Sequence, residues 1–175
     1  NQDQPELLYN AALEGHYGEV SRLLDCSLDP NTPMPSTGRY PLHASAYAGD
    51  EDSAKKLVGY YADVNVTDKE GITPFLEAVG SGDVGTMQYL LDVGADPLAI
   101  DCHGQDALHY ATLSRCNGGV MRGAIEFVLD NILGALKGNP EYEALRKSGH
   151  YDVNCIHSEA DARPLLHHVA ASDGD

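Results

Sequence analysis

Long hydrophobic runs are absent from this sequence of 175 residues. No stretch approaches the ~18 to 20 consecutive apolar residues needed to cross a bilayer. Residues 1–6 are polar and lack the basic-then-apolar order of a signal peptide. The sequence therefore predicts neither a membrane span nor a cleaved leader. It begins without Met and stops at Asp175 inside a repeating pattern, so we expect it to be a segment of a longer chain.

Cysteine is scarce and widely spaced. Cys26, Cys102, Cys116 and Cys155 form no Cys-x-x-Cys pair, so the sequence signals neither a zinc knuckle nor a small-domain disulfide framework. Reduced thiols favour an intracellular location, cytoplasmic or nuclear, although two disulfides remain an alternative.

Basic residues are few as well. Eleven Lys and Arg stand against twenty-seven Asp and Glu, which gives a formal net charge of −16. Such a charge repels nucleic-acid phosphates and anionic membrane surfaces and attracts cationic partners. The alternative is that the acidity serves solubility alone.

Signatures of catalysis are also missing. The pair Gly118–Gly119 follows no strand and precedes no Lys-Ser or Lys-Thr, so we interpret it as a turn and not as a phosphate loop. The adjacent His167 and His168 point about 100° apart on a helix, and no HExxH spacing accompanies them or the nearby His150 and His157. We expect no enzyme activity, no cofactor and no metal site.

What the chain does contain is a repeat of 33 positions. The segment Tyr40-Pro41-Leu42-His43 returns as Thr73-Pro74-Phe75-Leu76 and again as Asp106-Ala107-Leu108-His109. The segment Glu6 to Gly15 joins the series with one extra residue in its connection. A fixed period in this range indicates stacked structural units.

Each unit is predicted to be a helix, a turn, a second helix and an extended loop. Thr73 and Asp106 are expected to cap the first helix by accepting a hydrogen bond from its first turn, and Pro41 and Pro74 occupy its first position. Gly49 permits the positive φ that ends it. Apolar residues three or four apart give the second helix one buried face: Val20, Leu23 and Leu24, then Leu57 and Val58, then Met87, Leu90 and Leu91.

These residues resemble the ankyrin-repeat family, whose phrases Gly-x-Thr-Pro-Leu-His-x-Ala-Ala and Gly-Ala-Asp-Val-Asn are legible over about 115 residues. The resemblance implies a mostly α, single-domain solenoid over residues 1–175, with about four to five helix-turn-helix units and hairpin-like fingers. The expected repeats are approximately 5–37, 38–70, 71–103 and 104–157, followed by a partial fifth repeat at 158–175.

Two segments depart from the repeat. The proline-rich residues 30–37 predict a looser loop in place of the first finger. Residues 163–165 follow 106–108 by 57 positions, which places an insertion of 24 residues near 118–151. Within it, residues 121–136 predict an over-long second helix, and residues 139–147 a further helix that begins at an Asn cap. Residues 139–142 also have the letters of an NPxY docking peptide.

The resemblance further implies a concave groove lined by the first helices and the finger tips. The 33-residue register assigns this partner-binding face to Leu13, Glu14, Tyr47, Glu77, Ser81, Tyr110 and Leu113 of the helices and to Ile100 and His103 of the fingers. Tyr47 and Tyr110 are expected hot spots, and Glu14 and Glu77 are expected to favour a basic peptide. For each residue the alternative is a solvated or packing role, and the inserted segment is the second candidate surface.

Two further expectations rest on the resemblance. His43 and His109 are expected to form hydrogen bonds between repeats. Asn65 lies in a pattern like that on which ankyrin repeats are hydroxylated by an asparaginyl hydroxylase, whereas in the alternative it serves only the backbone of its turn.

The predicted function is therefore that of a protein-binding scaffold or adaptor whose partner is another protein or peptide. Two alternatives stay open, a regulatory or targeting arm of a larger enzyme or channel and a pathogen effector. The sequence predicts no nucleic-acid or membrane partner and leaves the oligomeric state open.

Overall fold

The computed structural model describes residues 4–112 and 118–132, which form four helical units in a row. The helices of the first two units are α1 (Gln4–Leu13) and α2 (Tyr17–Asp25), then α3 (Pro41–Ala48) and α4 (Glu51–Gly59). Those of the next two are α5 (Pro74–Ser81) and α6 (Val84–Asp92), then α7 (Ala107–Thr112) and α8 (Gly118–Phe127), which continues into the π-helix η1 (Val128–Ile132).

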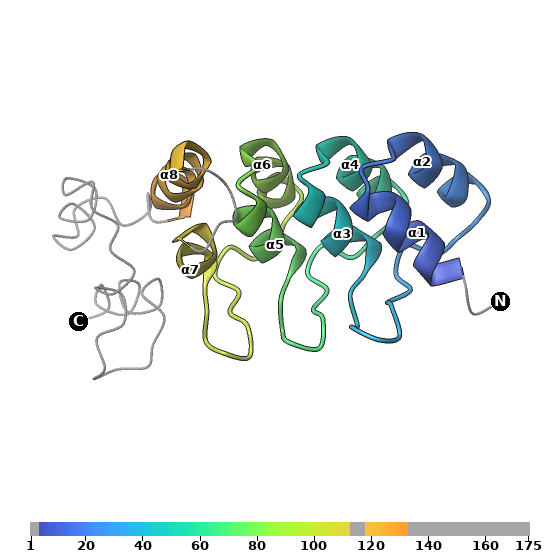
Figure 1. Cartoon of the computed structure of the whole chain (residues 1–175), viewed down its shortest axis with the longest axis horizontal. Coiled ribbons are helices and arrows are strands. Elements are labelled where there is room, and N and C mark those ends of the chain that lie inside the picture. The colour runs from blue at the N-terminus through green and yellow to red at the C-terminus, as the bar shows by residue number, and fades with distance from the viewer. Residues whose placement is uncertain (1–3, 113–117, 133–175) are drawn as a thin grey trace, which may run out of the picture.

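The helices pack in two layers. The inner row consists of α1, α3, α5 and α7, each in contact with the next, and the outer row of α2, α4, α6 and α8 is built in the same way. Figure 1 shows the two rows and the loops that extend from the inner row. The mostly α solenoid of stacked helix-turn-helix units that the sequence predicts is confirmed.

Local signals set the ends of the inner helices. The hydroxyl of Thr73 accepts a hydrogen bond from Leu76 N at 3.3 Å, and the carboxylate of Asp106 accepts one from His109 N at 3.1 Å. Pro41 is the first residue of α3 and Pro74 the first of α5, as expected. The following glycine ends α3 with a left-handed backbone, φ 67° at Gly49.

Three loops, here called fingers, connect the units: finger 1 (26–40), finger 2 (60–73) and finger 3 (93–106). A backbone hydrogen bond spans each tip, from Met34 N to Arg39 O at 2.7 Å, from Asp68 N to Ile72 O at 3.1 Å, and from Asp101 N to Gln105 O at 3.0 Å. Finger 1 differs from the others, because Pro35 stands where they have Asp68 and Asp101 and has no N–H to donate, so the donor is the preceding residue. The fingers also bond to one another, from Lys69 N to Thr37 O and from Cys102 N to Glu70 O.

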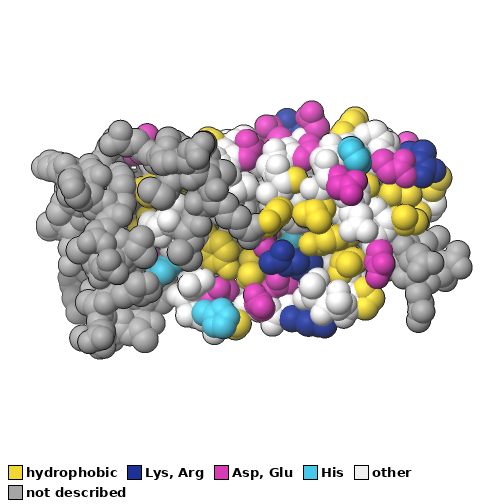
Figure 2. Space-filling view, in the orientation of Figure 1, with side chains coloured by type: hydrophobic (Ala, Val, Ile, Leu, Met, Phe, Trp, Pro, Cys, Tyr) yellow, Lys and Arg dark blue, Asp and Glu magenta, His cyan; other side chains and the backbone are white. Residues whose placement is uncertain are grey.

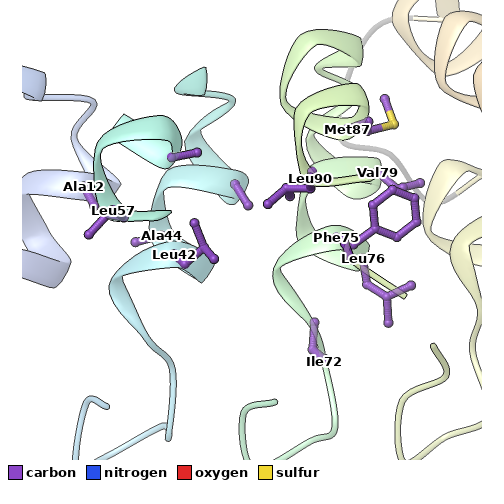
Figure 3. Packing of buried hydrophobic residues seen from close by; sticks show 14 of the residues in the cluster. Ala12, Leu42, Ala44, Leu57, Ile72, Phe75, Leu76, Val79, Met87 and Leu90 are labelled. Carbon is purple, nitrogen blue, oxygen red and sulfur yellow. The ribbon is translucent and has the colours of Figure 1, made fainter. Parts of the chain in front are cut away.

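The core runs along the interface between the two rows. Leu42, Phe75 and Leu108 occupy the same place in successive units, and each is at most 1% exposed. Figure 3 shows how Phe75 and Val79 of α5 lie close to Met87 of α6, all three within the same apolar cluster. Because each unit buries its apolar face against its neighbours, the stack has one continuous core.

The fourth unit has the longest outer helix among the described residues. Its α8 contacts α7 and α6 in the way that α6 contacts α5 and α4, and helical structure continues through η1 to Ile132. Gly118 and Gly119 begin α8, so the turn expected at this pair is wrong. The rest of the expected insertion, the helix at 139–147, the NPxY letters and the partial fifth repeat lie outside the described residues.

Over residues 4–112 and 118–132, no helix is both long and apolar enough to cross a membrane.

Candidate functional site

The inner row and the fingers enclose a groove of about 800 Å³. Its lining comes from three consecutive units and repeats every 33 positions. Five register positions contribute two or three residues each: Arg39, Ile72 and Gln105; Tyr47 and Gly80; Ala48 and Ser81; Gly49 and Gly82; Glu77 and Tyr110. The lining is completed by Glu70 and Asp83. Figure 2 shows hydrophobic side chains in a band along the middle of the stack, with acidic side chains and a basic one among them.

Gly80 lines the groove from α5, the middle one of three neighbouring inner helices. Tyr47 lines it from α3 and Tyr110 from α7, the two helices that flank α5. A Cβ atom on Gly80 would lie 3.5 Å from Cδ1 of Tyr110 and within 4 Å of no other atom beyond its neighbours. The groove is therefore open down to the backbone at this point, between two aromatic residues.

Tyr110 is held in place from below. Its hydroxyl donates a hydrogen bond to Oδ2 of the buried Asp101 at 3.1 Å. Burial, the charge of Asp101 and this bond all raise the pKa of the Tyr110 phenol, so it stays neutral at physiological pH. The ring therefore presents a fixed, uncharged surface to the groove.

Arg39 carries the groove's positive charge and is paired on two sides. Its Nη2 lies 2.6 Å from Oε1 of Glu77, and its Nε donates to Oδ2 of Asp68 at 3.2 Å. Both carboxylates are almost fully buried. Sequence reasoning missed Arg39, although the register that groups it with Ile72 and Gln105 was available as a signal.

Glu77 differs from the exposed charge that the sequence predicts. It is 4% exposed and lies at the bottom of the groove, because Arg39 folds over it from the base of finger 1. Burial raises the pKa of Glu77, while the guanidinium of Arg39 acts in the opposite direction. Its carboxylate is thus matched internally and is not available as a surface charge for a basic partner.

The other predicted partner-binding residues are spread along the stack. Tyr47, Ser81 and Tyr110 line the groove with Glu77. Leu13 and Glu14 are exposed in the first unit, where Glu14 pairs with His16. Ile100 and His103 are exposed on finger 3. Leu113 lies outside the described residues.

His43 joins two repeats, as expected. Its Nδ1 accepts a hydrogen bond from Tyr40 N at 3.2 Å, and its Nε2 lies 2.8 Å from the carbonyl oxygen of Ile72 in the next unit. His109 bonds within its own unit, where its Nδ1 lies 2.7 Å from Oδ1 of Asp106. Burial lowers the pKa of His43 to about 4, so the ring is neutral at physiological pH.

Asn65 forms a bridge between fingers that sequence reasoning did not foresee. Its Nδ2 donates to Gly94 O at 3.0 Å, and its Oδ1 accepts from Asp96 N at 2.8 Å. Asn31 makes the same two contacts one unit earlier, with Tyr61 O and Asp63 N. The Asn therefore serves the backbone of the next unit, and its hydroxylation stays a prediction.

Metal-binding chemistry finds no support in the part of the chain that the structure describes. No three His, Cys, Asp or Glu side chains there gather closely enough to hold an ion. The histidines at 150, 157, 167 and 168 lie outside the described residues.

Comparison with protein-family models gives two matches. One model, described as ankyrin repeats in three copies, matches residues 52–141, and another, described as ankyrin repeats in many copies, matches residues 8–58. The first alone spans half of the chain.

Similar segments occur in much larger proteins. Neurogenic locus notch homolog protein 2 of Homo sapiens is 32% identical over 105 residues, which are 59% of this chain and 4% of that protein. Protein HOS4 of Saccharomyces cerevisiae is 34% identical over 110 residues, 61% of this chain and 9% of that protein. This chain thus spans less than a tenth of the length of either relative.

Among solved structures, the human ASB11 ankyrin repeat domain is similar, with a TM-score of 0.62 and 26% sequence identity. The match covers 71% of this chain and 53% of that one.

Proposed function

Because the chain belongs to the ankyrin-repeat family, whose domains generally mediate protein–protein interactions, we propose that it is an intracellular adaptor or scaffold module that binds a partner protein or peptide in its groove. The observation that carries this proposal is the groove of about 800 Å³ that spans three units and is lined by Tyr47 and Tyr110. Tyrosine is among the residues that most often dominate binding energy, because it offers a large rigid surface and a polar tip.

The charge of the groove supports a basic partner. Among the described residues that line it, the cation is Arg39, which is already paired with two buried carboxylates. Glu70 and Asp83 also line the groove, and the chain as a whole carries a formal charge of −16. A partner segment with Lys or Arg would therefore be attracted over distance and paired on arrival.

The test is a direct binding measurement on identified partners. The full 175-residue chain is used to capture proteins, and each captured protein is then purified and titrated calorimetrically against the wild type and the Tyr47→Ala/Tyr110→Ala variant. Each substitution is expected to weaken binding by about 2 kcal/mol, as for a typical hot-spot aromatic.

Tyr17→Ala is the matched control, because Tyr17 is an exposed tyrosine of the outer row. It should leave affinity unchanged, and all variants should keep the helical circular dichroism of the wild type. A partner whose affinity is the same for the wild type and the double variant would move the site away from the groove.

One observation favours a second function. The matched segments are less than a tenth of the relatives' lengths, which suits an ankyrin arm that regulates or targets a larger protein. In that case the groove's partner would be another domain of the same protein, and a full-length chain would bind added partners more weakly than the isolated segment.

A further inference from the structure

The groove contains a gap of one side chain. Position 80 is equivalent to position 47, where Tyr47 covers the groove, yet Gly80 has no side chain to do so. Glycine within a helix is unfavourable relative to alanine, and an alanine Cβ would make only an ordinary contact here, 3.5 Å from Tyr110. The glycine therefore costs stability without relieving any clash, while it keeps the space over α5 open.

The surroundings of this gap, here called the Gly80 slot, combine aromatic and acidic groups. Tyr110 lies beside it, and Tyr47 lines the same groove from α3 on the other side of α5; the Tyr110 ring is fixed by its hydroxyl bond to Asp101. Glu70 lies on the same groove at finger 2, and Asp83 lies on it at the start of α6. The Asp83 carboxylate accepts one hydrogen bond from Thr86 N.

A cation with a flat face fits these surroundings best. Aromatic rings attract a guanidinium group through stacking and cation–π interaction, and carboxylates accept its fork of N–H donors. A lysine ammonium would meet the same charges but cannot stack, so it gains less from two tyrosines. An acidic or purely apolar side chain would bring no positive charge to Glu70 and Asp83.

We propose that the Gly80 slot accepts one arginine side chain of the partner, with the guanidinium beside Tyr47 and Tyr110 and within reach of Glu70 and Asp83. This inference rests on the proposed function, and it names the residue that the groove selects. It makes Gly80 a specificity determinant, because any side chain at that position would fill the slot.

The experiment uses the ¹⁵N-labelled full chain and small probes instead of an unknown partner. The probes are the N-acetyl methylamides of arginine, of lysine and of citrulline, the last being a neutral isostere of arginine. The arginine probe should shift the amide signals of Gly80 and Gly82 saturably, with a dissociation constant on the order of 1 mM for so few atoms. The lysine probe should bind several-fold more weakly than the arginine probe. The citrulline probe should bind at least ~10-fold more weakly, since it loses a charge-assisted hydrogen bond.

The key variant is Gly80→Ala, and its matched control is Gly59→Ala. Both glycines are helical, but a Cβ on Gly59 meets nothing within 4 Å, and Gly59 lies on α4 outside the groove. Gly80→Ala should weaken the arginine probe at least ~5-fold while its thermal midpoint does not fall, and Gly59→Ala should bind like the wild type. Glu70→Gln should also weaken the probe.

The outcomes separate this inference from the proposed function. Equal binding of arginine and citrulline, or of arginine and lysine, would overturn the arginine assignment, as would shifts that avoid Gly80. If no probe binds while an identified partner is still lost on Tyr47→Ala/Tyr110→Ala, the slot is overturned and the groove remains the binding surface. If the partner's affinity is also the same for the wild type and the double variant, both proposals fail.

Discussion

At the scale of single residues, Arg39 is the side chain on which the groove depends most. It pairs with Glu77 and Asp68, two carboxylates that are buried where water cannot compensate for a lost partner. Removing one member of such a group leaves uncompensated buried charge, so we expect Arg39→Met to lower the free energy of unfolding by about 3 kcal/mol. Urea denaturation at neutral pH measures this directly.

The double variant Arg39→Met/Glu77→Gln provides the control. Because it removes one of the two stranded charges, it should recover part of the lost stability, although Asp68 stays unpaired. Lys55→Met serves as a surface reference, since Lys55 pairs with Glu51 in an exposed i,i+4 contact and should cost less than about 1 kcal/mol. Similar losses for Arg39→Met and Lys55→Met would contradict this account.

His43 is expected to make stability depend on pH in a defined direction. Its Nδ1 accepts from Tyr40 N, so Nε2 must carry the proton and donate to Ile72 O, and only the neutral ring satisfies both bonds. The folded pKa of about 4 is below the ordinary value of 6.5, so below pH 6.5 the unfolded chain takes up a proton that the folded chain refuses. Stability from His43 is thus present above pH 6.5 and is lost as the pH falls towards 4.

The measurement compares wild type with His43→Gln. Glutamine does not titrate, so the difference in unfolding free energy between the two proteins should shrink by about 3 kcal/mol between pH 7 and pH 4. Other titrating groups are common to both proteins and cancel in the difference. A difference that stays constant over this range would mean that His43 is not held neutral.

Register predicted only some of the residues that line the groove, and not their burial. Tyr47, Ser81 and Tyr110 line it because equivalent positions in stacked units face the same way, while their role in binding stays a prediction. Glu77 was expected to be exposed and is buried, because its burial depends on Arg39, which reaches it from 38 positions earlier in the chain. A contact between finger and helix of this kind has no periodic signature.

At the scale of elements, the fingers are joined by asparagine bridges. Asn65 satisfies Gly94 O and Asp96 N of the following unit, and both are backbone groups of finger 3. We expect Asn65→Ala to cost about 1–2 kcal/mol and to speed hydrogen exchange at the Asp96 amide, because two bonds between units are lost at once.

Leu98 provides a comparison at the next equivalent position. The side chain of leucine has no amide group, so it cannot form the bridge that Asn31 and Asn65 make. Leu98→Ala should therefore leave the Asp96 amide unchanged. An Asn65→Ala variant as stable as the wild type would show that the bridges contribute nothing measurable.

The sequence predicted the elements well where caps and periodicity agree, as at Thr73 and Pro74 at the start of α5. It was less successful where composition outweighed geometry. The prolines of finger 1 suggested a loose loop; Pro35 does remove the donor that the other fingers use, but the preceding Met34 N closes the tip instead. The glycine pair 118–119 suggested a turn, whereas it forms the first residues of α8.

At the scale of the whole molecule, the stack converts a weak local pattern into one surface. No single unit forms the groove, because Tyr47, Gly80 and Tyr110 come from three consecutive units. The architecture was predictable because a 33-residue period repeated in register leaves few alternatives. The charge balance of the groove was not predictable, because it depends on an ion pair between units.

The net charge of −16 gives a final prediction, which concerns salt. Excess like charge destabilises a compact state through self-repulsion, whereas the exposed pairs Glu19–Arg22 and Glu51–Lys55 contribute little and the Arg39 group is shielded from ions by burial. Raising NaCl from ~10 to ~150 mM shortens the screening length from ~30 to ~8 Å, so repulsion should weaken more than attraction. We expect the free energy of unfolding, measured by urea denaturation, to rise by about 1 kcal/mol. KCl should give the same rise as NaCl, because screening does not depend on which cation is used. The same screening should lower the affinity for the arginine probe, so salt is expected to raise the stability of the fold and to weaken ligand binding. A fall in stability over this range would mean that ion pairs, and not repulsion, dominate the electrostatics of the stack.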